Sequence, residues 1–331
     1  MKHITDNSGA KEHNARHLLT VASLSPGEIR NLIRRAVKLK KHYRSGFPYR
    51  PAIGKILGLL FEKPSTRTRI SFESAMFQLG GQVSFMSSRD LQLRRGEPLE
   101  DTARVLSRYL DCLVVRTFGQ EVVETLAEWS DIPVINGLTN QHHPCQILSD
   151  VMTVMEHKGQ DLGSLKIAWV GDGNNVAHSW IEAAGKLGFN LSLACPEGYE
   201  PDPDILARAR EEAGGKITVV RSPEEALKDT DAVNVDVWAS MGQEEEAGRR
   251  MEIFAPYQLN REMLGHAGAE AIVLHCLPAH RGEEITEDVL EGPRSVVWDQ
   301  AENKMHIHRA VLEWAMRLDG VSAEERRQDE Q

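Results

Sequence analysis

Short apolar runs alternate with amphipathic segments along most of this chain. Residues 56–61 form a continuous apolar run, which is typical of a strand buried on both faces. In residues 66–79 the apolar side chains recur at the i, i+3, i+4 spacing of a helix, and the pair Gly80-Gly81 follows that segment. The same alternation resumes at residue 166 and continues to residue 298. Strands that alternate with helices predict parallel, doubly wound sheets of the α/β class.

The periodicity predicts two blocks of such elements. The expected strands are 56–61, 83–86, 112–116, 132–136, 166–170, 190–194, 217–220, 232–236, 271–275 and 295–298. The expected helices of the first block are 26–43, 66–79, 101–110, 121–129 and 144–157. We therefore expect two Rossmann-like domains, 1–150 and 151–300, with a C-terminal helix at 301–319 that packs back on the first. Because ligands bind beyond the carboxyl ends of parallel strands, we expect the active site in the cleft between the domains.

Composition narrows the class of protein. The 39 Lys and Arg residues against 49 Asp and Glu residues give a net charge of -10, whereas proteins that bind nucleic acid usually lean basic. No apolar run reaches the ~18 residues that span a bilayer, and the first 19 residues lack the apolar segment of a secretory signal. The four cysteines are scattered, which favours a reducing compartment. We therefore expect a cytoplasmic protein without a nucleic-acid or membrane partner.

The loop after the first strand is a candidate anion site. A helix start offers free backbone N–H groups and a partial positive charge, and hydroxyl and guanidinium groups match phosphate oxygens. A capped helix with solvated arginines is the alternative interpretation. Hydroxyl and guanidinium residues that follow one another directly after a buried strand favour a phosphate cradle instead. The residues in question are Ser65-Thr66-Arg67-Thr68-Arg69.

Five segments of the chain resemble signature segments of the aspartate and ornithine carbamoyltransferase family. They are 61–69, 116–118, 143–146, 236–242 and 275–282, and the similarity is collinear from about residue 17 to 319. The last two segments are similar to the ornithine enzymes in particular. The resemblance implies transfer of the carbamoyl group of carbamoyl phosphate to the δ-amine of L-ornithine, giving L-citrulline and phosphate, in arginine biosynthesis. It implies no metal and no cofactor, because phosphate is already an activated leaving group.

The resemblance also implies which residues bind carbamoyl phosphate. A charge on Arg116 at the end of a buried strand is costly unless it is paired, which favours a ligand-facing role. The imidazole of His143 and the amide of Gln146 can donate to the carbonyl oxygen, where negative charge grows. Lys304 stands where the family usually has Arg and lacks the bidentate fork. The full set is Ser65, Thr66, Arg67, Thr68, Gln92, Arg116, His143, Gln146, Cys276, Leu277 and Lys304.

The second substrate is assigned to the second half of the chain. A carboxylate at Asp236 suits the α-ammonium group of an amino acid. In similar enzymes the cysteine that matches Cys276 contacts the reacting amine, and the resemblance implies that Leu277 contributes a backbone group to the carbamoyl moiety. The Leu277-Pro278 bond is a candidate for the cis form. The ornithine-binding set is Asn175, Asp236, Ser240 and Met241, and the catalytic set is Cys276, Asp236, Arg116 and His143.

The resemblance further implies an oligomer. In similar enzymes a glutamine at the position of Gln92 reaches the carbamoyl phosphate of a neighbouring subunit. We therefore expect a homotrimer, or a multiple of trimers, with active sites shared between subunits. The sequence does not say whether citrulline is made or broken down in the physiological direction.

Several alternatives stay open at this point. A carbamoyltransferase could use aspartate or putrescine as the acceptor in place of ornithine. The loop 171–178 superficially resembles a dinucleotide fingerprint, but Val176 occupies its third glycine position, which weakens the case for an NAD-dependent dehydrogenase. His275, Cys276 and His280 suggest a metal site, but the spacing lacks a second pair of ligands typical of zinc. A non-catalytic binding subunit is the remaining alternative.

Overall fold

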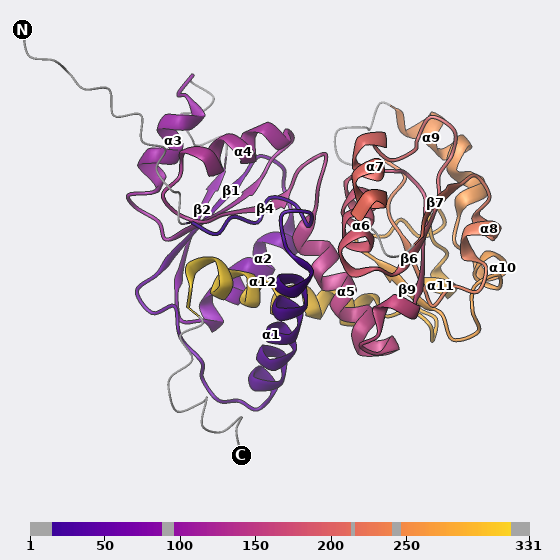
Figure 1. Ribbon diagram of the computed structural model, residues 1–331, viewed down its shortest axis with the longest axis horizontal. Helices are drawn as coiled ribbons and strands as arrows, with labels where there is room; N and C mark the ends of the chain where they lie inside the picture. The colour runs from indigo at the N-terminus through magenta and orange to yellow at the C-terminus, as the bar shows by residue number, and fades with distance from the viewer. Residues whose placement is uncertain (1–14, 88–95, 213–215, 240–245, 319–331) are drawn as a thin grey trace, which may run out of the picture.

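The computed structural model describes residues 15–87, 96–212, 216–239 and 246–318. Two parallel sheets form the centres of two lobes that lie side by side (Figure 1). The strand order is β2-β1-β3-β4 in the first sheet and β7-β6-β5-β8-β9 in the second. In each sheet the first strand lies inside the sheet, and the chain winds outward on both sides of it. The predicted doubly wound α/β fold with two lobes is therefore confirmed.

The strands are short, and most are largely buried, as the apolar runs predicted; the edge strands β2 and β7 are the more exposed ones. The first sheet contains β1 (Ile56–Phe61), β2 (Gln82–Ser87), β3 (Cys112–Arg116) and β4 (Val134–Leu138). The second contains β5 (Lys166–Val170), β6 (Asn190–Ala194), β7 (Ile217–Val220), β8 (Ala232–Val235) and β9 (Ile272–His275).

Helices connect the strands and cover the sheets. The first lobe contains α1 (Pro26–Arg44), α2 (Thr66–Gln78), α3 (Leu99–Leu106) and α4 (Gln120–Trp129). They are followed by α5 (Pro144–Lys158), η2 (Leu162–Ser164), α6 (Asn175–Leu187), α7 (Pro203–Glu212), α8 (Pro223–Leu227), α9 (Ala247–Phe254), η4 (Ala255–Tyr257), α10 (Arg261–Leu264), α11 (Glu287–Leu290) and α12 (Val297–Met316). None of the helices in the described ranges is long and apolar enough to cross a membrane.

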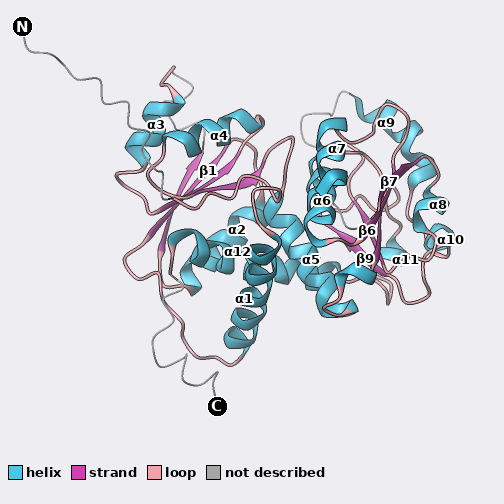
Figure 2. Cartoon of the chain, viewed as in Figure 1, coloured by secondary structure: helices cyan, strands magenta, loops and turns pink. Residues whose placement is uncertain are grey.

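Both faces of the first sheet are buried at β1, β3 and β4, which explains why these strands lack a polar alternation. Figure 2 shows α3 and α4 on one face and α1, α2 and α12 on the other. Leu57 and Leu59 belong to the core cluster on the α1, α2 and α12 side. Leu60 and Leu113 belong to a separate cluster with residues of α3 and α4. Alternate residues of one strand therefore serve two different cores.

The second sheet is covered in the same way. Trp169 of β5 packs in one cluster with Trp180 of α6 and Ile205 of α7. Val170 and Val235 pack in another cluster on the opposite face of this sheet, with residues of α8, α10 and α11. The carboxyl ends of the strands stay uncovered by these helices, and the loops that leave them are free to build a site.

Four predicted elements differ from the structure. The C-terminal helix expected at 301–319 runs from Val297 to Met316. The strand expected at 295–298 is wrong: Ser295 forms an isolated bridge with Val273, and α12 begins at Val297. A short apolar run cannot be told from the start of a buried helix by periodicity alone. The strand expected at 132–136 lies two residues later, at Val134–Leu138, and the helix expected at 101–110 runs from Leu99 to Leu106.

The last helix, α12, packs against α1, α2 and α5 and also contacts β9 of the second sheet. It therefore lies against the first lobe while its early turns reach the second. Because of this position, side chains near the start of α12 face the carboxyl ends of strands from both sheets.

Candidate active site

A cavity of about 400 Å³ is lined by residues of α2, α5, α12 and the end of β9, so both lobes contribute to its walls. Its volume suits a small metabolite rather than a polymer. Six of the predicted carbamoyl-phosphate residues line it, namely Thr66, Arg67, Gln146, Cys276, Leu277 and Lys304. The sequence did not single out several others that also line it, including Ser71, Ser74, Gln300 and Glu302, and it considered His275 only as a possible metal ligand.

The first wall of the cavity is the N-terminal turn of α2. Ser65 is the N-cap, and its hydroxyl accepts a hydrogen bond from the backbone nitrogen of Thr68 at 3.3 Å. Arg67 is exposed at the cavity wall, whereas Arg69 pairs with Glu73 at 2.8 Å and lies over the ring of Phe85. The two arginines of the motif therefore have different surroundings, and Arg67 is the one that faces the open space.

Arg116 ends β3 just behind this wall. It is only 8% exposed, and its Nε has no hydrogen-bond partner among the described residues. Burial, together with the positive charge of Arg67, lowers the pKa of the guanidinium to about 10. A buried cation with unused donors is costly, and an anionic ligand would offset that cost.

His143 is the N-cap of α5, and its backbone nitrogen donates to Ser179 Oγ at 2.9 Å. Its Nδ1 is buried without a hydrogen-bond partner among the described residues. Burial, together with the charges of Lys304 and Arg116, lowers the pKa of this imidazole well below its usual value. His143 is therefore a neutral ring that still has a hydrogen bond to offer.

Gln146 links two charged groups across the cavity floor. Its Nε2 donates to Asp150 Oδ1 at 2.7 Å, and its Oε1 accepts from Lys304 Nζ at 2.8 Å. Lys304 is buried, and burial lowers the pKa of its ammonium to about 8, with Arg116 adding to the effect. Lys304 therefore faces the cavity as a cation that is easily deprotonated.

Asp150 is a site residue that the sequence interpretation missed. Its Oδ1 accepts from Gln146 Nε2 and from Gln300 Nε2, each at 2.7 Å, while Gln300 Oε1 accepts from the backbone nitrogen of His275 at 2.9 Å. Burial raises the pKa of the Asp150 carboxyl to about 7. A signal existed: Gln146 and Asp150 are polar residues at i, i+4 spacing on a mostly apolar helix segment.

The second wall comes from the other lobe and centres on Asp236 and Cys276. The thiol of Cys276 donates to Asp236 Oδ1 at 2.7 Å, and Asn174 Nδ2 donates to Asp236 Oδ2 at 3.0 Å. Burial, and then the charge of Asp236, raises the pKa of the Cys276 thiol well above its usual value. The cysteine is therefore a neutral hydrogen-bonding group and not a thiolate nucleophile.

The structure places the two neighbouring asparagines differently from the expected pattern. Asn174, which the sequence interpretation passed over, is the residue that contacts Asp236. The amide of Asn175 donates to the backbone oxygen of Thr139 at 2.6 Å, so it bridges the lobes in this structure. Gln92, Ser240 and Met241 lie outside the described residues.

The end of β9 has an unusual backbone. Leu277 has a φ of 56°, and the Leu277-Pro278 bond is cis, as its sequence suggested. The backbone nitrogen of Leu277 donates to His275 Nδ1 at 2.8 Å, and His275 Nε2 lies 2.9 Å from Glu284 Oε1. Asp236, His275 and Cys276 lie close enough together to suggest a metal site. Because both ring nitrogens of His275 have protein partners, however, the imidazole has no free lone pair for a metal ion.

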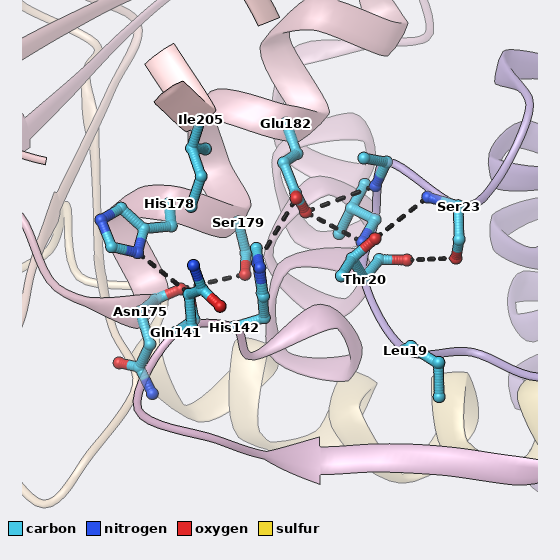
Figure 3. A network of polar contacts seen from close by, with 12 residues as sticks. Leu19, Thr20, Ser23, Gln141, His142, Asn175, His178, Ser179, Glu182 and Ile205 are labelled. Carbon is cyan, nitrogen blue, oxygen red and sulfur yellow. Dashed lines mark hydrogen bonds and ion pairs between the residues drawn. The ribbon is translucent and has the colours of Figure 1, made fainter. Parts of the chain in front are cut away.

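A polar network holds the loop that carries His143 against the second lobe (Figure 3). His142 Nδ1 lies 3.3 Å from Glu182 Oε1, and Glu182 Oε2 accepts from the backbone nitrogen of Val21 at 3.0 Å. His178 Nδ1 lies 3.0 Å from the backbone oxygen of Gln141. Burial lowers the pKa of His142 to about 4 and raises that of Glu182 to about 7. The contact between them therefore involves a neutral imidazole rather than a full ion pair.

The glycine-rich loop after β5 is closed by the chain itself. Gly173 donates from its backbone nitrogen to Tyr199 at 2.8 Å. A side chain at Gly173 would collide with the backbone at Glu200 and Pro201. In a dinucleotide-binding fold, the space next to this glycine is occupied by the pyrophosphate of the ligand. Here the protein's own backbone occupies that space. This geometry argues against the dehydrogenase alternative.

Comparison with known proteins points to one family. A family model described as the carbamoyl-P binding domain of aspartate/ornithine carbamoyltransferase matches residues 16–156. A second, described as the Asp/Orn binding domain, matches residues 163–315. The chain is 61% identical to an ornithine carbamoyltransferase of Desulfotalea psychrophila over 90% of this chain and 98% of the relative. It is 53% identical to one of Geobacter metallireducens, again over 90% and 98%.

Solved structures agree with these matches. An ornithine carbamoyltransferase from Pyrococcus furiosus superposes with a TM-score of 0.89 at 48% identity, covering 93% of this chain and 98% of that one. The anabolic enzyme from Campylobacter jejuni gives 0.86 at 39% identity, covering 91% and 99%. The chain belongs to the aspartate/ornithine carbamoyltransferase family, and within it to the ornithine carbamoyltransferases.

Proposed function

We propose that this chain transfers the carbamoyl group of carbamoyl phosphate to the δ-amine of L-ornithine and releases L-citrulline and phosphate. The observation that carries the proposal is the cavity itself. One wall presents the cationic start of α2 together with Lys304, and the opposite wall presents Cys276, whose thiol is bonded to Asp236. Such walls suit a dianion on one side and an amino acid with two amines on the other.

Carbamoyl phosphate would bind with its phosphate group at the start of α2. Ser65, Thr66 and Thr68 supply hydroxyl and backbone donors there, and Arg67 supplies a guanidinium. Arg116 and His143 have buried nitrogens without partners among the described residues, which suits them to the carbonyl oxygen. Gln146 and Lys304 complete this side, and the Leu277 backbone would meet the carbamoyl amino group.

Ornithine would bind from the second lobe. Asp236 would hold its α-ammonium group, with Asn175, Ser240 and Met241 around the amino-acid end. Cys276 would contact the reacting δ-amine. Because the thiol is neutral, it acts as a hydrogen-bonding group while Asp236 is the acceptor for the proton that the ammonium form must lose.

Once both substrates are bound, the carbamoyl transfer requires a neutral δ-amine and groups that stabilise the developing negative charge. A free alkyl amine has a pKa near ~10.4, so the site must hold the δ-amine in its neutral form. The amine nitrogen attacks the carbonyl carbon and forms the C–N bond. The C–O bond to phosphate breaks, phosphate leaves with the bonding electrons, and the nitrogen gives up a proton. Arg67, Arg116 and His143 stabilise the negative charge that develops on the two oxygens.

The remaining parts of the proposal concern organisation. We assign carbamoyl phosphate to residues 1–150, with the helix expected at 301–319 as their partner, and ornithine to residues 151–300. We also assign the chain to the cytoplasm, to arginine biosynthesis and to a homotrimer with shared sites, in which Gln92 reaches a neighbour. Exposed apolar side chains on α2 and β2 support an interface between subunits. They are Ile70 and Phe77 of α2 and Phe85 of the edge strand β2.

The acceptor is tested by offering the purified protein carbamoyl phosphate with ornithine, aspartate or putrescine in parallel. We expect a carbamoylated product with ornithine and little with the others, because aspartate would bring a second carboxylate to Asp236 and putrescine lacks an α-carboxylate. The product is measured by colorimetric assay and mass spectrometry. A higher kcat/KM with aspartate or putrescine would overturn the proposal.

A further inference from the structure

The backbone at Leu277 adopts a conformation that a leucine rarely takes. Its φ of 56° lies in the left-handed region, where Cβ crowds the backbone. Such a conformation persists only when its surroundings enforce it, and it concentrates at ligand sites. Asp229 and Arg317 are the other non-glycine residues of the described chain with positive φ, and neither lines the cavity. The groups that hold the Leu277 backbone in this conformation therefore also shape the cavity.

Two buried side chains form the support. Leu277 donates from its backbone nitrogen to His275 Nδ1 at 2.8 Å, and His275 Nε2 lies 2.9 Å from Glu284 Oε1. The same Glu284 oxygen accepts from the backbone nitrogen of His280 at 2.6 Å. The side chains of His275 and Glu284 are 0% and 1% exposed. The segment 277–280 is thus tied at its start and at its end to one histidine–carboxylate pair.

The hydrogen bonds dictate the state of the imidazole. Because Nδ1 must accept the Leu277 N–H, the ring proton has to be on Nε2, where it is donated to Glu284. In a doubly protonated ring, the N–H at Nδ1 would point at the N–H of Leu277, and no hydrogen bond could form between them. The backbone of His275 is held as well, since its nitrogen donates to Gln300, which in turn is bonded to Asp150. Both ring nitrogens are used up inside the protein, so His275 has no lone pair with which to act as a base.

We propose that His275 and Glu284 are positioning residues that hold the Leu277 backbone against the carbamoyl group of the substrate. This inference rests on the proposed function, in which the Leu277 backbone meets the carbamoyl amino group. The phosphate end of the substrate lies instead at the start of α2, which is a separate element. Loss of the support therefore weakens recognition of the carbamoyl end and leaves recognition of phosphate unchanged.

Amide substitutions separate the two ring nitrogens. The side-chain amide of asparagine reaches the position of Nδ1, and that of glutamine reaches the position of Nε2. His275→Asn therefore keeps an acceptor for Leu277, whereas His275→Gln keeps a donor for Glu284 and leaves the Leu277 N–H without a partner. Glu284→Gln keeps the acceptor oxygen, and Glu284→Ala removes it. Val273→Ala is the matched control, because Val273 is a fully buried residue of the same strand that does not line the cavity.

The measurement is calorimetric binding of carbamoyl phosphate, and separately of inorganic phosphate, to the whole protein without acceptor. We expect His275→Gln and Glu284→Ala to weaken carbamoyl phosphate binding by about tenfold, the effect of one lost hydrogen bond to a buried donor. Binding of inorganic phosphate should stay at the wild-type value in both. His275→Asn, Glu284→Gln and Val273→Ala should keep carbamoyl phosphate binding within about threefold of wild type.

Two outcomes would overturn the inference. One is carbamoyl phosphate binding by His275→Gln that equals that of wild type. The other is a parallel loss of inorganic phosphate binding, which would mean general damage to the cavity. A wild-type protein that binds phosphate but not carbamoyl phosphate would instead overturn the proposed function, and the inference with it. Circular dichroism of each variant establishes that a loss of binding belongs to a folded protein.

Discussion

Lys304 shows how one residue sets the electrostatics of the cavity. Most charged residues at a protein surface keep their ordinary pKa, but Lys304 is buried with Arg116 nearby and has a pKa of about 8. An arginine at this position would stay charged at every physiological pH. The choice of lysine therefore makes the cationic wall sensitive to mild alkali.

This property predicts a pH dependence of substrate binding. Binding of the carbamoyl phosphate dianion should weaken as the pH rises from about 7.5 to 9.5, because the pKa of Lys304 is about 8 and the ammonium loses its charge in that window. In Lys304→Arg the affinity should stay nearly constant over the same range. Calorimetric titrations at several pH values test this, and identical curves for the two proteins would contradict it.

Residues of the site differ in how far the sequence revealed them. Arg116 and Asp236 stand at strand ends, where a charge after an apolar run is a readable signal. Asp150 and Glu284 contact other protein groups, and His275 lines the cavity but has protein partners at both ring nitrogens. Their roles become visible only in the folded structure, where these partners come together. Asn174 was passed over because its neighbour Asn175 has the same side chain, and only the geometry of the turn separates them.

At the scale of elements, the start of α2 combines a helix terminus with two arginines that have different surroundings. Arg67 borders the cavity, and Arg69 is paired with Glu73. The pattern of apolar residues located this helix, because strand, turn and helix follow one another without interruption. It failed at residues 295–298, since the first turn of α12 has the apolar composition of a strand.

The pair of arginines offers a matched experiment. Arg67→Ala should weaken carbamoyl phosphate binding by about 100-fold, since it removes charge-assisted hydrogen bonds to the phosphate. Arg69→Ala removes the same charge from the same helix turn but leaves the cavity wall intact, so its effect should stay within about threefold. Calorimetry of both variants decides the matter. Equal losses would mean that only the net charge of the turn counts.

At the scale of the whole molecule, contacts between the lobes place the two walls of the site. Glu182 of α6 accepts backbone hydrogen bonds from Val21 and Ala22 of the N-terminal segment and lies beside His142. The two backbone contacts are invisible from periodicity, because each joins residues at least 160 positions apart. The fold of each lobe was predictable from local pattern, whereas their mutual arrangement depends on such distant pairs.

Glu182 also gives the stability of the molecule a defined pH dependence. Its pKa is about 7 when folded, against 4.5 as the reference value, so between these values the folded protein binds more protons. The contribution of Glu182 to stability is therefore full below pH 4.5 and is lost as the pH rises through 7. Glu182→Gln keeps an acceptor for Val21 and Ala22 but does not titrate.

We expect Glu182→Gln to gain stability relative to wild type as the pH rises from 5 to 8, by about 2 to 3 kcal/mol. Urea unfolding of both proteins at the two pH values measures this difference. Wild-type protein at each pH is the control for all other titrating groups. A difference that stays constant, or that shrinks towards alkaline pH, would show that Glu182 keeps its charge when folded.

The position of α12 has a consequence for how the molecule is made. The helix that completes the core around α1 is encoded at the far end of the chain, after the entire second lobe. During synthesis on the ribosome, the first lobe therefore has an uncovered apolar face until the second lobe has been made and residues 297–316 emerge. A nascent chain arrested before residue 297 would display that face, and we expect it to be the stage at which chaperones are needed most.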